Sequence, residues 1–203
     1  MNSGVLTLSP PRARVPVMVS GQGRSGTTAM ARVLRAMGYA GYWDDDSRNA
    51  EELAVQQAWE WGDRESLSRV HEDRLQAPWV CKVPNASWWA THWPVMSGAW
   101  GGDWILMVRD PLMMSAHDGE PRFDRWRHRA SGYAETVECS LKLSQTGRGV
   151  SVVCYEALLT KPLEVFDELG FEQRLGMALH WDRYLSARRE IVPSDPRYYG
   201  TGH

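Results

Sequence analysis

The chain has 203 residues, of which 43% are hydrophobic and 24% are charged, and its formal net charge is −2. This length fits one ordinary domain with a sizeable core, and this composition excludes a disordered chain. The small net charge argues against broad binding to nucleic acid, which normally requires a strong basic excess. No stretch approaches the roughly 20 apolar residues of a membrane-spanning helix, so no membrane partner is expected.

The three cysteines, Cys81, Cys139 and Cys154, are scattered and odd in number, so they form neither a disulfide framework nor a metal-ligand spacing. Residues 1–15 hold no apolar core of signal-peptide length. We therefore expect a cytoplasmic protein without a metal site. Residues 1–203 are expected to form a single domain with irregular ends at 1–14 and 191–203, and most of the 11 tryptophans are expected to lie in its core.

The first predicted unit is a strand, a glycine loop and a helix. Residues 15–20 (VPVMVS) form a short apolar run, which suits a strand buried on both faces of a parallel sheet. From Met30 to Met37 apolar residues recur at the spacing of one helical face, and Gly38 follows where a C-terminal cap belongs.

The rest of the chain continues to alternate between helices and strands. Helices are predicted over residues 50–72 and 126–146, and strands over Trp79–Val83, Trp104–Val108 and Val150–Tyr155. A last helix begins near Pro162 and ends near Gly170. Strands separated by helices imply right-handed crossovers, so the predicted fold class is α/β, with a central parallel sheet flanked by helices in three layers.

The segment Gly21–Thr28 (GQGRSGTT) has the glycine spacing of a P-loop between a strand and a helix. Backbone N–H groups at the start of that helix would point at an anion, and the helix dipole favours negative charge there. A nucleotide triphosphatase places a lysine after the last glycine, where this chain has Thr27, and its cation is instead Arg24. This arrangement suits a donor with a shorter, less charged 5′ chain that needs no metal bridge.

The loop resembles that of the sulfotransferases that use 3′-phosphoadenosine-5′-phosphosulfate (PAPS), with glycine in the family's proline position. The resemblance implies a P-loop fold in which one segment holds the 5′-phosphosulfate: Gly23, Arg24, Ser25, Gly26, Thr27 and Thr28. It also implies that Arg24 stabilises charge on the bridging oxygen of the donor.

A second landmark is Arg109, which follows an apolar strand as the family's 3′-phosphate-binding arginine does. A guanidinium offers a fork of donors that matches phosphate oxygens. Family members usually add a serine eight residues later, where this chain has His117, with Ser115 two residues earlier. Both side chains remain candidates for the same phosphate.

Two further segments resemble the family. The segment around Tyr155 resembles a strand-Tyr-Glu-x-Leu motif whose tyrosine contacts the adenine, and residues 79–84 (WVCKVP) resemble a strand with Lys-x-Pro. The second resemblance places Lys82 near the transferring group. The family's basic Arg-Lys-Gly loop has no counterpart in the tail, which offers only Arg188 and Arg189.

Sulfuryl transfer also needs a group that takes the acceptor's proton. Some family members use a histidine two residues after the strand lysine, where this chain has Pro84, so a carboxylate is expected. The first candidates are Glu51 and Asp44, the neighbouring acids are Asp45 and Glu52, and the more distant alternatives are His71 and His92.

These landmarks predict an enzyme that moves the sulfuryl group of PAPS in line to a hydroxyl or amine and leaves adenosine 3′,5′-bisphosphate. The sequence indicates neither the acceptor nor the oligomeric state. One alternative is a P-loop kinase for a nucleotide or small molecule, which would need Mg²⁺ and a lysine in or near the loop. Another is a nucleotide-binding module without catalysis.

Overall fold

The computed structural model describes residues 3–43, 50–74, 78–86, 92, 94–111, 114 and 123–191. Its strands form one six-stranded sheet in the order β1-β6-β5-β2-β4-β3. The strands are β1 (Val5–Ser9), β2 (Val17–Gly21), β3 (Ala40–Gly41), β4 (Trp79–Lys82), β5 (Asp103–Val108) and β6 (Val150–Cys154). Every neighbouring pair is parallel except β1 and β6.

Strand β1 corrects the prediction of an irregular end at residues 1–14. It pairs antiparallel with β6 at the edge of the sheet and remains partly exposed. Because it is short, lies close to two prolines and pairs with a strand in the last third of the chain, the local sequence carries little sign of it. The sheet is therefore mixed rather than purely parallel.

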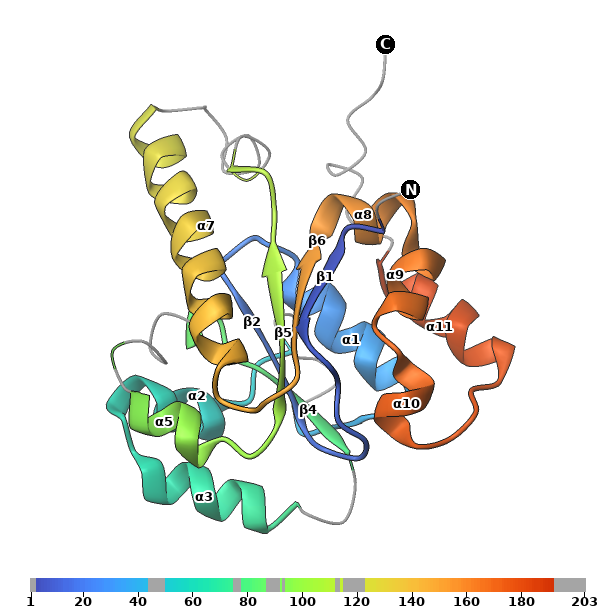
Figure 1. The fold of residues 1–203 in the computed structure, drawn as a ribbon, viewed down its shortest axis with the longest axis horizontal. Helices are drawn as coiled ribbons and strands as arrows, with labels where there is room; N and C mark the ends of the chain where they lie inside the picture. The colour runs from blue at the N-terminus through green and yellow to red at the C-terminus, as the bar shows by residue number, and fades with distance from the viewer. Residues whose placement is uncertain are drawn as a thin grey trace.

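Helices cover both faces of the sheet (Figure 1). One face carries α1 (Thr27–Met37), α8 (Tyr155–Thr160), α9 (Pro162–Glu168), α10 (Phe171–Leu175) and α11 (Trp181–Ile191). The other carries α2 (Leu53–Trp61), α3 (Arg64–Glu72), α5 (Pro94–Ala99) and α7 (Phe123–Ser144). The three-layer α/β prediction is confirmed. No described helix is long and apolar enough to cross a membrane.

The helix expected over residues 50–72 is in fact two helices. Gly62 ends α2 in the left-handed conformation, with φ of 65°, and Asp63 caps α3 by accepting a hydrogen bond from the Ser66 backbone N–H. Glycine at a C-terminal cap avoids the steric cost that a side chain meets at such a φ. The break lets α2 and α3 pack against each other.

The hydrophobic core consists of two clusters, one on each face of the sheet. In β2, Val17 and Val19 point towards α1, whereas Met18 points towards α2 and α5. On the second face, four fully buried tryptophans meet edge to face, namely Trp59, Trp79, Trp100 and Trp104. The core role predicted for tryptophan is confirmed for these four.

A buried charged network closes the amino end of the sheet. The carboxylate of Asp103 accepts hydrogen bonds from the backbone N–H groups of Arg12 (2.8 Å) and Gly149 (2.9 Å). It also accepts from the guanidinium groups of Arg12 (2.7 Å) and Arg174 (3.2 Å). Arg174, which is fully buried, donates further to the Leu169 carbonyl and to the Ser151 hydroxyl. The Asp103 carboxylate is thus paired with two guanidinium groups.

Candidate anion site at the carboxyl end of the sheet

The glycine loop leaves the central strand between two cationic strand ends. Strand β2 lies between β5 and β4, so the loop after Gly21 is flanked by Arg109 on one side and Lys82 on the other. The arrow of β5 in Figure 1 points to this edge. Connections run in opposite directions from β2 and β5, and in open α/β sheets such a switch point is where ligands bind.

Close contacts shape the loop. A Cβ at Gly21, where φ is 149°, would collide with the Met107 carbonyl, and a Cβ at Gly26, where φ is 92°, would collide with the Tyr155 ring. Between these glycines Arg24 is held at φ 73°, a left-handed conformation that side-chain residues rarely adopt. The loop is therefore built tightly, with one strained residue at its centre.

Arg109 supports this loop from the neighbouring strand. Its Nη1 donates to the Arg24 carbonyl at 3.3 Å, and its guanidinium carbon lies 4.9 Å from the centre of the Tyr155 ring. Its Nε lies 3.6 Å from a carboxylate oxygen of Glu156. The predicted 3′-phosphate ligand and the predicted phosphate loop are thus in direct contact.

Three buried polar atoms of the loop and of Arg109 lack a hydrogen-bond partner among the described residues. They are the Gln22 side-chain oxygen, the Ser25 hydroxyl oxygen and the Arg109 Nε, of which the last two can donate a hydrogen bond. Buried donors in native proteins are nearly always satisfied, so such atoms beside a glycine loop call for a ligand with several acceptor oxygens. The residues present therefore fit phosphate or sulfate groups.

Lys82 and Glu51 form an ion pair beside the loop. Lys82 ends β4 and is 4% exposed, and its Nζ lies 2.7 Å from Oε1 of Glu51. Burial lowers the pKa of Lys82 below its usual range, and the Glu51 carboxylate offsets part of that shift. The structure thus brings together Lys82, predicted to lie near the transferring group, and Glu51, predicted as a candidate base.

Glu52 points away from this pair. Its carboxylate lies 2.5 Å from a guanidinium nitrogen of Arg74, which stacks 3.9 Å from the centre of the Tyr42 ring. Burial raises the pKa of Glu52, and Arg74 only partly offsets this. Adjacent residues in extended backbone point to opposite sides, so only Glu51 of this couple reaches Lys82. Asp44 and Asp45 lie outside the described residues.

The remaining predicted residues are placed unequally. Tyr155 is buried, with its ring packed on Gly26. His71 packs against the Trp79 and Trp100 rings near the amino end of the sheet, and burial lowers its pKa. His92 is exposed. Ser115 and His117 lie outside the described residues.

One loop contact was missed by the sequence analysis. Arg129 on α7 donates from Nη1 to the Gly23 carbonyl at 3.0 Å, and one residue earlier the His128 carbonyl accepts a bond from the Gln22 side chain. The run RWRHR at 125–129 places basic residues four apart on one helical side, which is the signal that could have found it.

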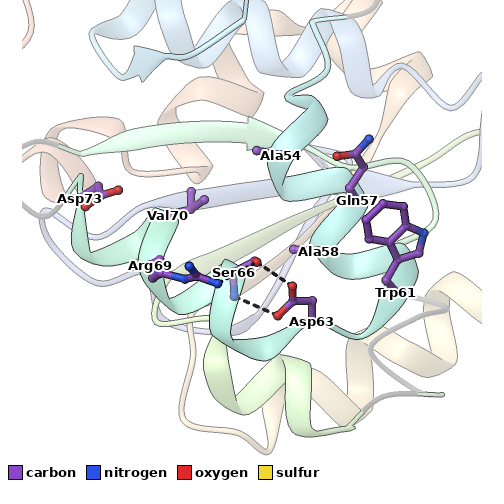
Figure 2. Close-up of a pocket in the computed structure, with 9 residues that line it drawn as sticks. All are labelled: Ala54, Gln57, Ala58, Trp61, Asp63, Ser66, Arg69, Val70 and Asp73. Carbon is purple, nitrogen blue, oxygen red and sulfur yellow. Dashed lines mark hydrogen bonds between the residues drawn. The ribbon is translucent and has the colours of Figure 1, made fainter.

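A groove of about 310 Å³ lies elsewhere, between α2 and α3 (Figure 2). Its lining includes the exposed indole of Trp61 and the side chains of Arg69 and Asp73, together with Asp63, which accepts a hydrogen bond from the Ser66 hydroxyl. Neither the glycine loop nor Lys82, Arg109 or Glu51 contributes to this lining. The groove is therefore separate from the anion site.

No protein-family model and no curated protein sequence matches this chain. Solved structures do. The sulfotransferase domain from the Synechococcus PCC 7002 olefin synthase matches with a TM-score of 0.54 at 16% identity, over 96% of this chain and 85% of that one. Mouse sulfotransferase SULT7A1, complexed with PAP, matches with a TM-score of 0.52 at 13% identity, over 95% of this chain and 68% of that one.

Sulfotransferase STF1 from Mycobacterium tuberculosis H37Rv also matches, with a TM-score of 0.48 at 12% identity, over 91% of this chain and 72% of that one. The two matches with the higher TM-scores, which extend over nearly the whole chain, show that it has the sulfotransferase fold. The resemblance seen in the sequence is thus confirmed at the level of the fold.

Proposed function

We propose that this chain, which has the sulfotransferase fold, is an enzyme that transfers the sulfuryl group of PAPS to a hydroxyl or amine of an acceptor molecule. One observation carries the proposal. The glycine loop is flanked by Lys82 and Arg109, and the Ser25 hydroxyl and Arg109 Nε are buried there without hydrogen-bond partners among the described residues. A donor with phosphate and sulfate oxygens would satisfy both atoms.

The donor would lie across the switch point. In this arrangement residues 23–28 hold the 5′-phosphosulfate, Arg109 binds the 3′-phosphate, and Tyr155 lies on the adenine side. Ser115 and His117 remain the proposed additional ligands of the 3′-phosphate. The contact between Arg109 and the Arg24 carbonyl supports this placement, because it joins the two phosphate-binding elements into one unit.

The chemistry is then divided between cations and one carboxylate. Arg24 and Lys82 stabilise the charge that grows on the bridging oxygen as its bond to sulfur breaks. Glu51 takes the proton of the acceptor group as the new bond to sulfur forms, and the electron pair of the broken bond stays on adenosine 3′,5′-bisphosphate. The ion pair of Glu51 and Lys82 supports these roles because it holds base and cation side by side.

Donor preference separates this function from its alternatives. A P-loop kinase would bind ATP with Mg²⁺, whereas the proposed enzyme binds adenosine 3′,5′-bisphosphate without metal. The cation inside the loop, Arg24, favours the second. For the enzyme we also propose a cytoplasmic location, no resident metal, and no nucleic-acid or membrane partner.

Isothermal titration tests the assignment directly. Adenosine 3′,5′-bisphosphate is titrated with and without EDTA, and ATP is titrated with Mg²⁺. We expect metal-independent binding of the bisphosphate that is at least about tenfold tighter than binding of ATP. Release of labelled sulfate from PAPS, with water as acceptor, then distinguishes an enzyme from a module without catalysis. Tighter binding of ATP with Mg²⁺ would overturn the proposal.

A further inference from the structure

We infer that Arg129 is a positioning residue of the donor site, which holds Arg24 in its left-handed conformation together with Arg109. The inference rests on the proposed function, and nothing in the sequence motifs of the loop points to a residue on α7. The inference is based on two hydrogen bonds, one to the peptide group before Arg24 and one to the peptide group after it. Arg129 binds the carbonyl before that residue and Arg109 binds the carbonyl of that residue itself.

The two bonds fix both dihedral angles of Arg24. The peptide group before Arg24 has its oxygen held by Arg129 at 3.0 Å, and the one after it has its oxygen held by Arg109 at 3.3 Å. Peptide groups are planar, so φ and ψ of the residue between two held groups cannot relax freely. A residue at φ 73° needs such restraint, because its side chain disfavours this conformation.

The same bond orients a donor group of the loop. In a trans peptide the C=O and the N–H point in opposite directions. With the Gly23 oxygen turned outward to Arg129 on α7, the Arg24 N–H is turned to the other side of the loop. Turned away from α7, the Arg24 N–H can join the backbone N–H groups that bind an anion at the start of a helix.

Helix α7 is shaped to reach the loop. Gln22 is buried and donates through Nε2 to the His128 carbonyl at 3.4 Å. A Cβ at Gly132 would collide with the Gln22 side chain, so α7 carries a glycine where the loop packs closest. The bond from Arg129 is thus part of a packed contact between segments 106 residues apart in the chain, and the helix holds it in place.

A double-mutant cycle isolates this role. R129M removes the hydrogen bond, and R127M removes an equal charge from an exposed position on the same helix. R129M should weaken adenosine 3′,5′-bisphosphate by at least about tenfold and R127M by less than about threefold. In the R24G background, where glycine adopts the positive φ without strain, R129M should cost less than about threefold.

Amide exchange provides a readout that needs no ligand. The Ser25 N–H bonds to the Gln22 carbonyl at 3.1 Å inside the loop, and R129M should speed its exchange by at least about tenfold while R127M leaves it unchanged. Faster exchange in a chain that binds no bisphosphate would keep the positioning role and overturn the proposed function. Unchanged exchange in R129M, or equal losses of bisphosphate affinity with and without R24G, would overturn the inference.

Discussion

The two ends of the parallel strands differ in how their buried charged and polar groups are paired. At the amino end, the buried carboxylate of Asp103 is surrounded by four donors, two of them guanidinium groups and two of them backbone N–H groups. At the carboxyl end, cations gather around a loop that has a strained arginine, and two buried donors there, the Ser25 hydroxyl and the Arg109 Nε, lack a hydrogen-bond partner among the described residues. The amino end thus satisfies the charge of Asp103 internally, whereas the carboxyl end keeps donors that the proposed anion would satisfy.

This difference separates stability from function. A satisfied network of buried charges contributes to folding only as long as every member is present, because each unpaired charge is costly. Strain and unsatisfied donors cost stability and persist where a ligand uses them. Substitutions at the amino end should therefore change unfolding, and substitutions at the carboxyl end should change binding and rate.

The largest expected effect is on the rate. Glu51→Gln preserves the size of the side chain and an acceptor for the Lys82 ammonium, but removes the proton affinity that the reaction needs. Release of labelled sulfate from PAPS should fall by about 10² to about 10⁴, with bisphosphate affinity nearly unchanged. Glu60→Gln, an exposed change on α2, is the matched control. A variant that keeps a third of the rate would move the base elsewhere, with Asp44 and Asp45 next to be tested.

The amino end should respond in free energy of unfolding. Asp103→Ala leaves the fully buried Arg174 guanidinium without its counter-charge, so urea unfolding should show a loss of about 3 to about 5 kcal/mol. Bisphosphate affinity of the folded variant should change by less than about threefold, because the site is at the other end of the strands. Asp182→Ala removes an exposed carboxylate and should cost under about 1 kcal/mol. A comparable loss of unfolding free energy in both variants would show that the charged network around Asp103 does not stabilise the fold.

Arg109→Ala should discriminate between nucleotides. Removing one charge-assisted contact costs about 1.5 to about 3 kcal/mol, which is roughly 10- to 150-fold in affinity. Adenosine 3′,5′-bisphosphate should lose this much more affinity than adenosine 5′-monophosphate, which lacks the 3′-phosphate and is affected only through the lost bond to the Arg24 carbonyl. Parallel titrations of both nucleotides measure the difference, and equal losses would place Arg109 against another part of the donor.

The smallest effect concerns pH. Burial lowers the pKa of Lys82, so its ammonium loses its proton at a lower pH than an ordinary lysine does. The rate of sulfate release should therefore decline on the alkaline side before pH reaches about 10.4, the usual lysine pKa. In K82R, whose guanidinium keeps its charge, the decline should move to higher pH. An alkaline limb that is identical in wild type and K82R would assign it to another group.

The same shift has a consequence for stability. Because the folded pKa of Lys82 lies below its unfolded value, the unfolded chain binds more protons between the two values, and the free energy of unfolding rises with pH in that interval. Comparing wild type with K82R in urea at several alkaline pH values measures this contribution. The rise should be absent in K82R.

The sequence predicted the parts of the fold and site that depend on neighbouring residues. Continuous apolar runs predicted β2, β5 and β6, and glycine spacing predicted the loop between β2 and α1. The break between α2 and α3 was missed although Gly62 and Asp63 form an ordinary pair of helix caps. A glycine followed by an aspartate is a sequence signal for the end of one helix and the start of the next.

Local sequence patterns could not predict which side chains from distant segments contact each other. Four acids are candidates for the base, and only the folded structure shows that Glu51 pairs with Lys82 while Glu52 pairs with Arg74. The bond of Arg129 to the loop depends in the same way on how α7 lies across the sheet. Charge pairing at long range is set by the fold, so a sequence reveals the residues but not their partners.

The central position of the loop strand has a kinetic consequence. The contact between Arg24 and Arg109 spans 85 residues, and parallel pairing needs whole helices between the strands, so we expect the carboxyl end of the sheet to form late in folding. An anion bound there joins segments that are already folded. It should slow unfolding and leave the folding rate nearly unchanged. The chain with bound nucleotide should then be digested by a protease more slowly than the free chain, and the difference in rate should grow with nucleotide concentration.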